Sequence, residues 1–597
     1  MMSKIKVLPV YPEFPDTFWS FKKSLRFVRK KSLMPPTGLL TVMAMLPEDK
    51  FELQRVVDLN VEPLTDRHLK DADIVFTSTM VVQEDSHKEV IDKAHFYGKK
   101  VVAGGPFPTS YPERNSKADY IVAGEAEVTL QPFLEDILNR NPKRVYTEKE
   151  VKERNRVSLT KGGKVLLTNT PLPKWDLLNL KDYSCAAIQY SRGCPFDCDF
   201  CDITNLYGRE SRTKTTKQMI KELEALVRAR HTGSVFIVDD NFIGNRANLR
   251  ELLPEMIKWQ QSNNFPFTFF TEASINLAWP ENKDVLENMV NAGFNQVFVG
   301  IESSDKDVLD KMGKKQNTKL SALESVRILQ NSGLEVTAGF IIGADGEKPN
   351  AFDNLFKLIQ SAGIITPMPG LLTAMKGTRL YKRLQKEGRL REESHGNNTH
   401  QPKFNFEPEM DEAVLIQGYK GLLKRLFDDK NYYERCRVLR DRLGPDYHPT
   451  RGSDISGVIF LGRSLKEQLF ASGGLEYAKY LLETAWKRPS YFPESVAQAI
   501  KLIHFKSLTN AMLDAEEYKP QIEGLYQQFF SKVAKIHSKY GYDFAIERKK
   551  VVNAAGRILK KAEKRYHHLD TGFRREAANS LENLKCRVQS VLRQYRI

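Results

Sequence analysis

The sequence of 597 residues has only six cysteines, and three of them, Cys185, Cys436 and Cys586, are scattered along it. Scattered cysteines do not form the disulfide framework of a small secreted protein. No apolar run approaches the roughly 20 residues that a membrane-spanning helix needs, and we expect no signal peptide. Walker A and G-x-G-x-x-G motifs are also missing, so no nucleotide site is indicated. We therefore expect a cytoplasmic protein, because thiols stay reduced in that compartment.

Hydrophobic residues make up 41% of the chain, which is enough for ordinary globular cores. The net charge of +16 is distributed unevenly, because residues 531–597 carry 17 Lys and Arg against 6 Asp and Glu. Such a basic region attracts nucleic acid or anionic lipid, or it is simply a pair of solvated helices. Composition alone leaves these alternatives open.

Residues 1–135 alternate short apolar strands with helices. Apolar runs of this length between helices predict an α/β domain, a doubly wound parallel sheet covered on both faces. Ligands of such sheets bind in the crevice at the carboxyl ends of the strands. The predicted strands are residues 5–9, 55–59, 74–78, 100–103 and 120–123.

A second series of strands and helices follows a predicted linker at residues 136–180. It occupies residues 181–400, and its six units are too few for an eight-unit barrel, so we predict a partial (β/α)6 barrel. Residues 401–597 are predicted to be a helical C-terminal region. The barrel strands are expected at residues 186–190, 234–238, 268–270, 296–299, 337–342 and 368–372.

Three cysteines, Cys194, Cys198 and Cys201, lie together in a C-x₃-C-x₂-C run directly after the first barrel strand. A cubane iron–sulfur cluster held only by protein takes four thiolates. Three thiolates on one loop leave one iron open, as a catalytic metal keeps one position for substrate. Zinc and buried structural thiols are the alternatives, although no histidine occurs between Cys201 and His231 to complete a zinc site.

This cysteine run and the strand ends behind it resemble the radical S-adenosylmethionine (SAM) enzymes over about residues 180–400. The resemblance implies a [4Fe–4S] cluster on the three cysteines, with SAM bound at the open iron and Phe200 packed on the adenine. An Asp-Asp pair such as Asp239-Asp240 is also an ordinary helix N-cap. The resemblance implies these SAM-binding residues: Phe200, Asp239, Glu272, Ser274, Glu302, Ser303, Gly339 and Ile341.

The N-terminal domain is similar to the cobalamin-binding domains that precede one branch of this superfamily, with a nucleotide-binding or receiver-like sheet as the alternative. Where these domains carry a cobalt-ligating histidine, this chain has Asn60. An amide is a poorer cobalt ligand than imidazole, so cobalamin is expected without a histidine beneath it. The implied cobalamin-binding residues are Thr37, Gly38, Asn60, Ser78, Thr79, Gly104, Gly105, Pro106 and Glu125.

Over roughly residues 1–430 the chain is most similar to the subgroup that contains the hopanoid C-2 methylases. The resemblance implies a cobalamin-dependent methyltransferase acting on an unactivated carbon, with a small-molecule or lipid-like substrate and an electron donor such as flavodoxin or ferredoxin. Cobalamin-dependent rearrangement or cyclisation without methyl transfer is one alternative, and a redox or cobalamin sensor with a nucleic-acid-binding basic tail is another. Nucleic acid is not the expected partner. The aromatic and basic segment 14–31 either contacts an apolar or lipid-like substrate or packs against the barrel. The chain as a whole is compatible with peripheral membrane contact.

Overall fold

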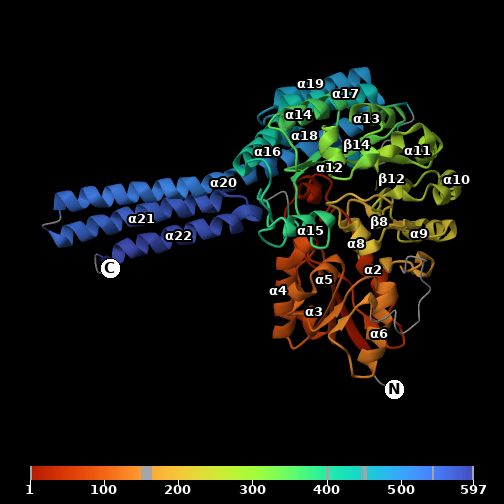
Figure 1. Ribbon diagram of the computed structural model, residues 1–597, viewed down its shortest axis with the longest axis horizontal. Helices are drawn as coiled ribbons and strands as arrows, with labels where there is room; N and C mark the ends of the chain where they lie inside the picture. The colour runs from red at the N-terminus through yellow and green to blue at the C-terminus, as the bar shows by residue number, and fades with distance from the viewer. Residues whose placement is uncertain are drawn as a thin grey trace. The chain divides into compact units, whose positions relative to one another are not determined.

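The computed structural model describes residues 3–149, 164–397, 402–445, 447, 454–540 and 543–594. The chain divides into two compact units, Met1–His504 and Phe505–Ile597. The first unit contains two large parallel sheets with the helices that cover them (Figure 1). The predicted linker includes residues 150–163, which lie outside the described residues, and the predicted domain boundaries stay predictions.

The N-terminal sheet is parallel and has helices on both faces, which confirms the predicted doubly wound fold (Figure 1). Its strand order is β2-β1-β4-β5-β6-β7, with β3 beside β1. The chain adds β2 and β3 on one side of β1 and then β4 to β7 on the other side. A crevice forms at the carboxyl ends of the strands where the strand order reverses in this way. The strands are β1 (Ile5–Tyr11), β2 (Phe51–Leu53), β3 (Val57–Asp58), β4 (Ile74–Ser78), β5 (Lys100–Gly104), β6 (Tyr120–Val122) and β7 (Val145–Tyr146). The helices are α1 (Lys22–Leu25), α2 (Thr37–Ala44), α3 (Asp66–Lys70), α4 (Glu84–Phe96), α5 (Pro106–Ser110) and α6 (Ala126–Leu138).

The second sheet is the predicted six-unit partial barrel, with six parallel strands in the order β8-β11-β12-β13-β14-β15. A short antiparallel ribbon, β9 and β10, lies beside it and is not predicted from the sequence. The strands are β8 (Ala186–Ile188), β9 (Ser191–Arg192), β10 (Arg212–Thr213), β11 (Gly233–Ile237), β12 (Phe267–Glu272), β13 (Phe294–Glu302), β14 (Glu335–Ile342) and β15 (Pro367–Leu371). The helices are α8 (Ile203–Tyr207), α9 (Thr216–Arg228), α10 (Arg246–Ser262), α11 (Lys283–Asn291), α12 (Lys306–Lys311), α13 (Ala322–Asn331), α14 (Ala351–Ala362) and α15 (Arg379–Lys386).

Alternation along the strands separates the two faces of the barrel sheet. On β11, Val235 and Ile237 are fully buried, whereas Phe236 between them is only half-buried. Phe270 on β12 and Phe298 on β13 are half-buried in the same way. The rings of Phe236 and Phe270 stack with their centres 4.6 Å apart. The inner face of the barrel is therefore an open surface lined with aromatic rings.

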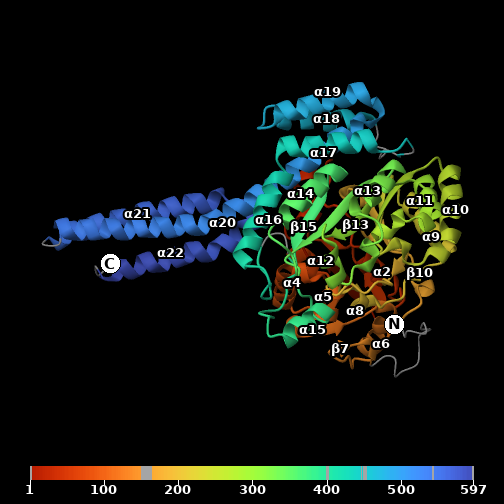
Figure 2. The same cartoon turned by 45° about the horizontal axis from the view of Figure 1, so that its top comes forward.

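Helices that follow the barrel complete the first unit, and α17, α18 and α19 lie side by side in it (Figure 2). The buried guanidinium of Arg435 on α17 donates to Gln360 of α14 at 2.6 Å, which anchors this layer to the barrel. Burial lowers the pKa of Arg435 to about 10. The helices are α16 (Glu412–Leu426), α17 (Asp429–Arg442), α18 (Asp454–Gln468), α19 (Gly474–Lys487) and the first turns of α20 (Phe492–Tyr540).

The second unit has a core of its own. The rest of α20 packs with α21 (Phe544–His568) and α22 (Arg574–Gln594) around the buried side chains of Phe529, Val551 and Val588. The basic C-terminal region of the sequence is thus part of a helical bundle. Within the described part of the chain, no helix is both long and apolar enough to span a membrane.

Candidate active site

The three predicted cluster ligands lie on the loop between β9 and α8. Cys194, Cys198 and Cys201 are free, half-buried thiols there. Strand β10 pairs with β9 and closes the loop at its base. Gly193 precedes the first cysteine with a φ of 89°, and any side chain at this position would collide with the carbonyl of Glu210. Glycine is therefore required where the chain turns into the loop.

Two side-chain amides donate hydrogen bonds to the cysteine sulfurs. Nδ2 of Asn241 lies 3.7 Å from Sγ of Cys194, and Nε2 of Gln316 lies 3.6 Å from Sγ of Cys198. Burial raises the pKa of the Cys194 thiol, so a bound metal must displace its proton. Among the described residues, no three His, Cys, Asp or Glu side chains lie close enough to share one ion, whereas a cubane takes each thiolate on a separate iron. Three thiols on one loop, two of them with amide donors at their sulfurs, fit such a cluster.

Two aspartates after β11 hold the base of the cysteine loop by hydrogen bonds. Asp239 accepts hydrogen bonds from the N–H groups of Tyr190 and Ser191, both at 2.8 Å, and from the Ser191 hydroxyl at 2.6 Å. Asp240 accepts from the N–H of Gly193 at 3.0 Å. Burial raises the pKa of Asp239 to about 7. Both oxygens of this predicted SAM-binding residue are thus engaged in positioning the cysteine loop.

A lysine that the sequence analysis does not single out joins Glu302 to Phe200. Nζ of Lys314 lies 2.6 Å from Oε1 of Glu302 and 5.6 Å from the centre of the Phe200 ring. Burial lowers the pKa of Lys314, but the charge and hydrogen bond of Glu302 together with the charges of Cys198 and Cys201 raise it by more in sum, so the ammonium stays charged. Glu302 has a φ of 65°, a left-handed conformation that costs a non-glycine residue energy and that clusters at functional sites. No motif marks Lys314 in the sequence.

Two predicted residues lie at the end of β12. Glu272 is half-buried and has no hydrogen-bond or ion-pair partner among the described residues. Burial, with the charge of Asp240 adding to it, raises the pKa of Glu272 to about 8. The N–H of Ser274 donates to Oδ1 of Asn241 at 3.0 Å, while its hydroxyl lies 3.2 Å from the same oxygen and donates over the shorter distance of 2.5 Å to Oδ1 of Asn276. Ser274 therefore holds Asn241 beside Cys194, while the carboxyl of Glu272 is left for a ligand.

The opposite side of the site is formed by β13 and β14. Gly339 and Ile341 share one face of β14, and a side chain at Gly339 would come within 3.0 Å of the Phe298 ring. The hydroxyl of Ser303 accepts from the N–H of Asp305 at 3.1 Å. The glycine keeps the inner face open next to the strand ends.

Most of the predicted cobalamin-binding residues lie at the carboxyl ends of the N-terminal strands, and Thr37 and Gly38 begin α2. Gly105 has a φ of 96°, and a Cβ on it would lie 2.8 Å from the backbone nitrogen of Thr79. Oγ1 of Thr79 is buried and has no hydrogen-bond partner among the described residues. Buried polar atoms are normally paired, so an orphaned hydroxyl at this crevice fits a bound molecule that supplies the partner.

Asn60 and Thr37 are engaged inside the protein. Nδ2 of Asn60 donates to Asp58 at 2.7 Å, and its Oδ1 accepts from the N–H of Phe14 at 2.9 Å. The Thr37 hydroxyl donates to the carbonyl of Ala187 on β8 at 2.9 Å. Thr37 therefore links the N-terminal domain to the first barrel strand.

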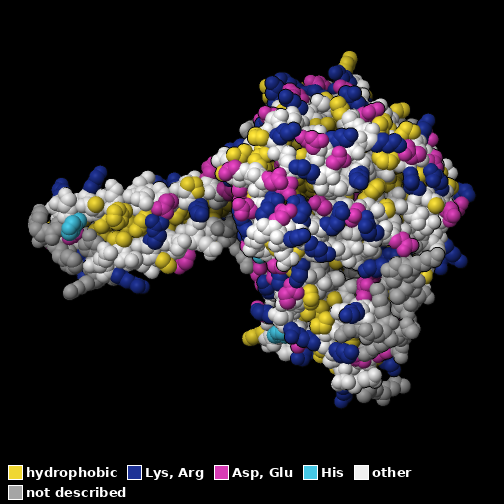
Figure 3. Space-filling view, in the orientation of Figure 1, with side chains coloured by type: hydrophobic (Ala, Val, Ile, Leu, Met, Phe, Trp, Pro, Cys, Tyr) yellow, Lys and Arg dark blue, Asp and Glu magenta, His cyan; other side chains and the backbone are white. Residues whose placement is uncertain are grey.

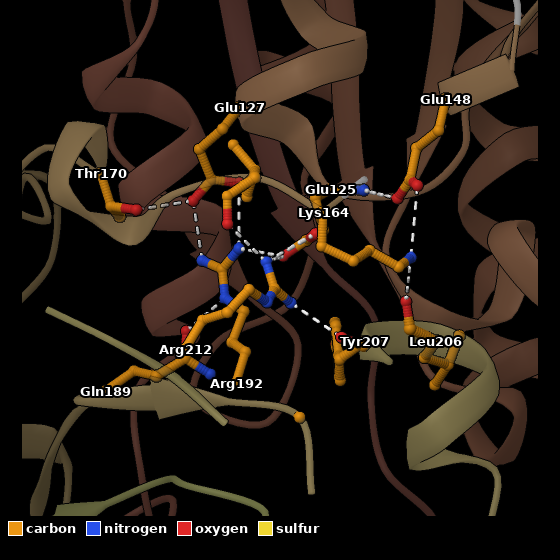
Figure 4. A network of polar contacts seen from close by, with 12 residues as sticks. Glu125, Glu127, Glu148, Lys164, Thr170, Gln189, Arg192, Leu206, Tyr207 and Arg212 are labelled. Carbon is orange, nitrogen blue, oxygen red and sulfur yellow. Dashed lines mark hydrogen bonds and ion pairs between the residues drawn. The ribbon is translucent and has the colours of Figure 1, made fainter. Parts of the chain in front are cut away.

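Four buried charges join the two sheets beside the cysteine loop, and we call them the interdomain clamp (Figure 4). Glu125 and Glu127 come from the segment after β6, and Arg192 and Arg212 come from β9 and β10. Arg192 lies 2.8 Å from Glu127 and 3.1 Å from Glu125, and Arg212 lies 2.9 Å from Glu125. Burial would raise the pKa of Glu127, but the charge of Arg192 lowers it to about 2. The predicted cobalamin contact Glu125 thus has two arginine partners and a positioning role.

Neighbouring contacts extend the clamp on both sides (Figure 4). The hydroxyl of Thr170 donates to Glu127 at 2.8 Å. Lys164 lies 3.2 Å from Glu148 and donates to the carbonyl of Leu206 on α8 at 3.0 Å. The predicted linker therefore contributes residues to the contact between the N-terminal domain and the cysteine loop.

We expect Glu127→Gln to lower the free energy of unfolding by about 3 kcal/mol, because it removes the nearer carboxylate of the largely buried Arg192 guanidinium and leaves that group only Glu125, which Arg212 shares. Asp284→Asn is the matched control, since Asp284 pairs with Arg250 at 2.6 Å on the surface, where both side chains are about half exposed. It should cost less than about 1 kcal/mol. Urea unfolding followed by tryptophan fluorescence measures the free energy of unfolding of both variants. Equal losses of stability would contradict a stabilising role of the interdomain clamp.

The same comparison has a predicted pH dependence. The pKa of Glu127 falls from 4.5 to about 2 on folding, so its contribution is present above pH 4.5 and is lost as the pH falls toward 2. The difference in stability between wild type and Glu127→Gln should shrink over that interval.

Three family models match the chain: the B12 binding domain at residues 26–134, the Radical SAM superfamily at 188–359 and Domain of unknown function (DUF4070) at 378–518. An uncharacterized methyltransferase of Synechocystis sp. is 39% identical over 434 residues, which are 72% of this chain and 78% of that protein. Hopanoid C-2 methylase of Rhodopseudomonas palustris is 35% identical over 465 residues, 76% of this chain and 84% of that protein.

A solved structure of the radical SAM methyltransferase TsrM from Kitasatospora setae, with cobalamin and a [4Fe–4S] cluster bound, has the same fold. It matches with a TM-score of 0.54 at 15% identity and covers 84% of this chain and 99% of that chain. The family resemblance expected from the motifs is confirmed, and the cofactors are a [4Fe–4S] cluster, SAM and cobalamin. The chain belongs to the cobalamin-dependent radical SAM methyltransferases.

Proposed function

We propose that this enzyme methylates an unactivated carbon of a lipid-like substrate. The observation that carries the proposal is the aromatic inner face of the barrel, where Phe236, Phe270 and Phe298 remain half-buried. Trp19, with 46% of its surface exposed, lies over Phe298 with the ring centres 5.0 Å apart. Apolar and aromatic walls with a few polar groups are typical of small-molecule sites. The relative that is 35% identical is named as a methylase of hopanoids.

When bound, the cluster and SAM supply a 5′-deoxyadenosyl radical, and cobalamin supplies the methyl group. The chain's own residues hold and orient these groups: Cys194, Cys198 and Cys201 would hold the cluster. The free carboxyl of Glu272 and the pair of Glu302 with Lys314 are the proposed partners of the polar groups of SAM. Asp239 and Ser274 act through the loop that they position. The proposed SAM-binding set is Phe200, Glu272, Glu302, Ser303, Lys314, Gly339 and Ile341.

For cobalamin we propose the crevice at the carboxyl ends of β4 and β5. The unpaired hydroxyl of Thr79 is the proposed polar partner of cobalamin. Gly105 has no side chain, so the backbone after β5 can approach the backbone of Thr79 closely. The amide of Asn60 is already bonded to Asp58 and Phe14, so we propose that cobalt takes no ligand from it. The other members of this set are Gly38, Ser78, Gly104 and Pro106.

Counting the products of SAM tests the proposed function. With SAM, a reductant and a hopanoid lipid, we expect S-adenosylhomocysteine and 5′-deoxyadenosine in equal amounts, because methylation uses one SAM for each. Cys198→Ala should abolish both products. Cys586→Ala is the control, because that cysteine is exposed in the second unit and should retain both.

Two outcomes would contradict the proposal. Formation of 5′-deoxyadenosine alone would favour a rearrangement or cyclisation without methyl transfer. Absence of both products from protein with intact cofactors would favour a sensor, which salt-sensitive binding to DNA or RNA would then support.

A second test addresses the cobalamin crevice. Gly105→Ala adds a Cβ that would lie 2.8 Å from the backbone nitrogen of Thr79, so we expect the purified protein to retain much less cobalamin in its visible spectrum. Gly98→Ala is the control, because Gly98 lies in the same domain with a φ of 67° but has nothing within 4 Å of its Cβ position. Equal retention in both variants would place cobalamin elsewhere.

We also propose that an acidic electron carrier such as flavodoxin or ferredoxin docks on a cleft outside the cysteine loop. The cleft has a volume of about 850 Å³ and is lined by Pro195 and Phe196 of the loop and by Gln316, whose amide bonds Cys198. Five cations line it: Arg209, Lys311, Lys315, Arg379 and Arg383.

The positive charge of this cleft is only partly neutralised. Three aspartates also line the cleft: Asp197, Asp199 and Asp310. Asp197 pairs with Arg209 at 2.9 Å and with Arg379 at 3.1 Å, and Arg383 pairs with Asp345 at 2.7 Å. Lys311 and Lys315 are exposed and have no acidic partner among the described residues. Transient electron-transfer partners use small interfaces that are steered by complementary charge. The cytoplasm, where such carriers stay reduced, is the proposed compartment.

The double variant Lys311→Glu/Lys315→Glu should slow reduction of the cluster by reduced flavodoxin about tenfold at low salt, because charge steers the encounter. The loss should shrink at high salt. Reduction by the small cation methyl viologen should not slow. Lys217→Glu/Lys221→Glu, two exposed lysines on α9, is the matched control. Slower reduction by both reductants would indicate a damaged loop and contradict the docking site.

A further inference from the structure

The hairpin of α18 and α19 carries an unusually apolar outer face. Phe470 and Trp486 are each 88% exposed, Leu482 is 72% exposed and Leu475 is 69% exposed. Figure 3 shows hydrophobic side chains that protrude from the surface at this end of the first unit, beside Lys and Arg. Single exposed apolar residues are normal, but several large ones on one element mark an interaction site. This hairpin belongs to the part of the chain that matches the domain of unknown function.

Helix α19 is apolar on two opposite sides. Its inner side buries Tyr477, Tyr480 and Leu481 against the neighbouring helices. Its outer side repeats apolar residues at Leu475, Leu482 and Trp486, a spacing that places them on one stripe. Leu465 and Leu469, four residues apart on or just after α18, are also more than a third exposed. Nothing in the described part of the first unit covers this apolar stripe, so its side chains are exposed to solvent unless another surface binds there.

The charges of the hairpin favour an anionic surface. Its glutamates are neutralised inside the protein: Glu467 by Arg26, and Glu476 and Glu483 by Arg437. Lys466 and Lys487 are exposed beside the apolar stripe. Neither forms an ion pair within 4 Å among the described residues, and the acidic neighbour of Lys487, Glu483, is already paired with Arg437. Exposed positive charge thus remains next to exposed Trp, Phe and Leu side chains.

This combination distinguishes a membrane from a protein partner. Lysine is depleted in protein–protein interfaces, whereas aromatic residues are enriched in them. Lysines that flank Trp, Phe and Leu on a helix are typical of segments that lie in the headgroup region of a bilayer. Lysine near such a surface also attracts anionic lipids.

We propose that the outer face of α18 and α19, defined by Phe470, Leu475, Leu482 and Trp486 with Lys466 and Lys487, binds the surface of a membrane that contains anionic lipid. The protein lies on the bilayer and inserts only these side chains. For the role of this contact in substrate supply, the inference rests on the proposed lipid substrate.

The N-terminal segment connects this face with the barrel. Arg463 of α18 donates to the backbone carbonyls of Arg26 and Phe27, at 3.2 and 3.1 Å. Eight residues upstream of Phe27, Trp19 lies over the inner-face residue Phe298. The segment from Trp19 to Phe27 therefore links the α18–α19 hairpin to the inner face of the barrel.

Flotation of the full-length protein with vesicles tests the proposal. With vesicles of phosphatidylcholine and about one third phosphatidylglycerol, wild type should float with the vesicles, and Phe470→Ser/Trp486→Ser should bind at least about tenfold more weakly. Both side chains are 88% exposed, so the folded structure should not change. Phe96→Ser is the matched control, because Phe96 is 83% exposed on α4 and should bind like wild type.

The lysines provide a second, independent variant. Lys466→Glu/Lys487→Glu should lose binding to anionic vesicles, with a loss that is largest at low salt. Failure of wild type to bind these vesicles would overturn the proposal. A dimer that Phe470→Ser/Trp486→Ser converts to a monomer, without any vesicle binding by wild type, would show a protein interface instead.

The failure of this inference can be separated from failure of the proposed function. Methylation of a hopanoid lipid dispersed in detergent should be unchanged in Phe470→Ser/Trp486→Ser, because that assay bypasses the membrane. Loss of vesicle binding with intact methylation in detergent supports the proposal, whereas loss of both would show that the variant damages the enzyme and would overturn it.

Discussion

The buried charges of the interdomain clamp are the contact on which the rest of the site depends. Burying an unpaired carboxylate or guanidinium is costly, so Glu125, Glu127, Arg192 and Arg212 are stable only when the N-terminal domain and the β9–β10 ribbon meet in one register. That ribbon carries the cysteine loop, so the same contact relates the proposed cobalamin crevice to the proposed cluster ligands. Chemistry shared by two cofactors depends on such fixed separations.

The polar and apolar parts of the barrel have different tasks. The strand ends supply Asp239 and Asp240, which hold the cysteine loop by hydrogen bonds. They also supply the ion pair of Glu302 with Lys314, the proposed polar partner of SAM. The inner face below them is aromatic, and Trp19 adds a ring from outside the barrel. The outer face of α18 and α19 extends this apolar character to the surface of the same unit. Both surfaces support the lipid-like substrate that we propose.

Much of the fold can be predicted from the sequence because strong local patterns mark it. The strand Ile74–Ser78 has the predicted bounds, since an apolar run is a local feature of the sequence. Strands β2, β7, β9 and β10 are not predicted, because two or three residues contain no periodicity to detect. Lys314 and the clamp are not predicted either, because their contacts join residues that are distant along the chain, as Arg192 and Glu127 are.

The sequence by itself determined the three candidate cluster ligands, because cysteines within one short loop are a local requirement of cluster binding, whereas SAM and cobalamin followed from the resemblance to a known family. It also determined two parallel α/β sheets, because their strands and helices alternate in one order. Only the tertiary structure decided that Glu125 and Asn60 bond within the protein, and that Phe470 and Trp486 stay uncovered. Pairing of charges and burial of apolar faces depend on which surfaces meet in space, and no local pattern of residues specifies that.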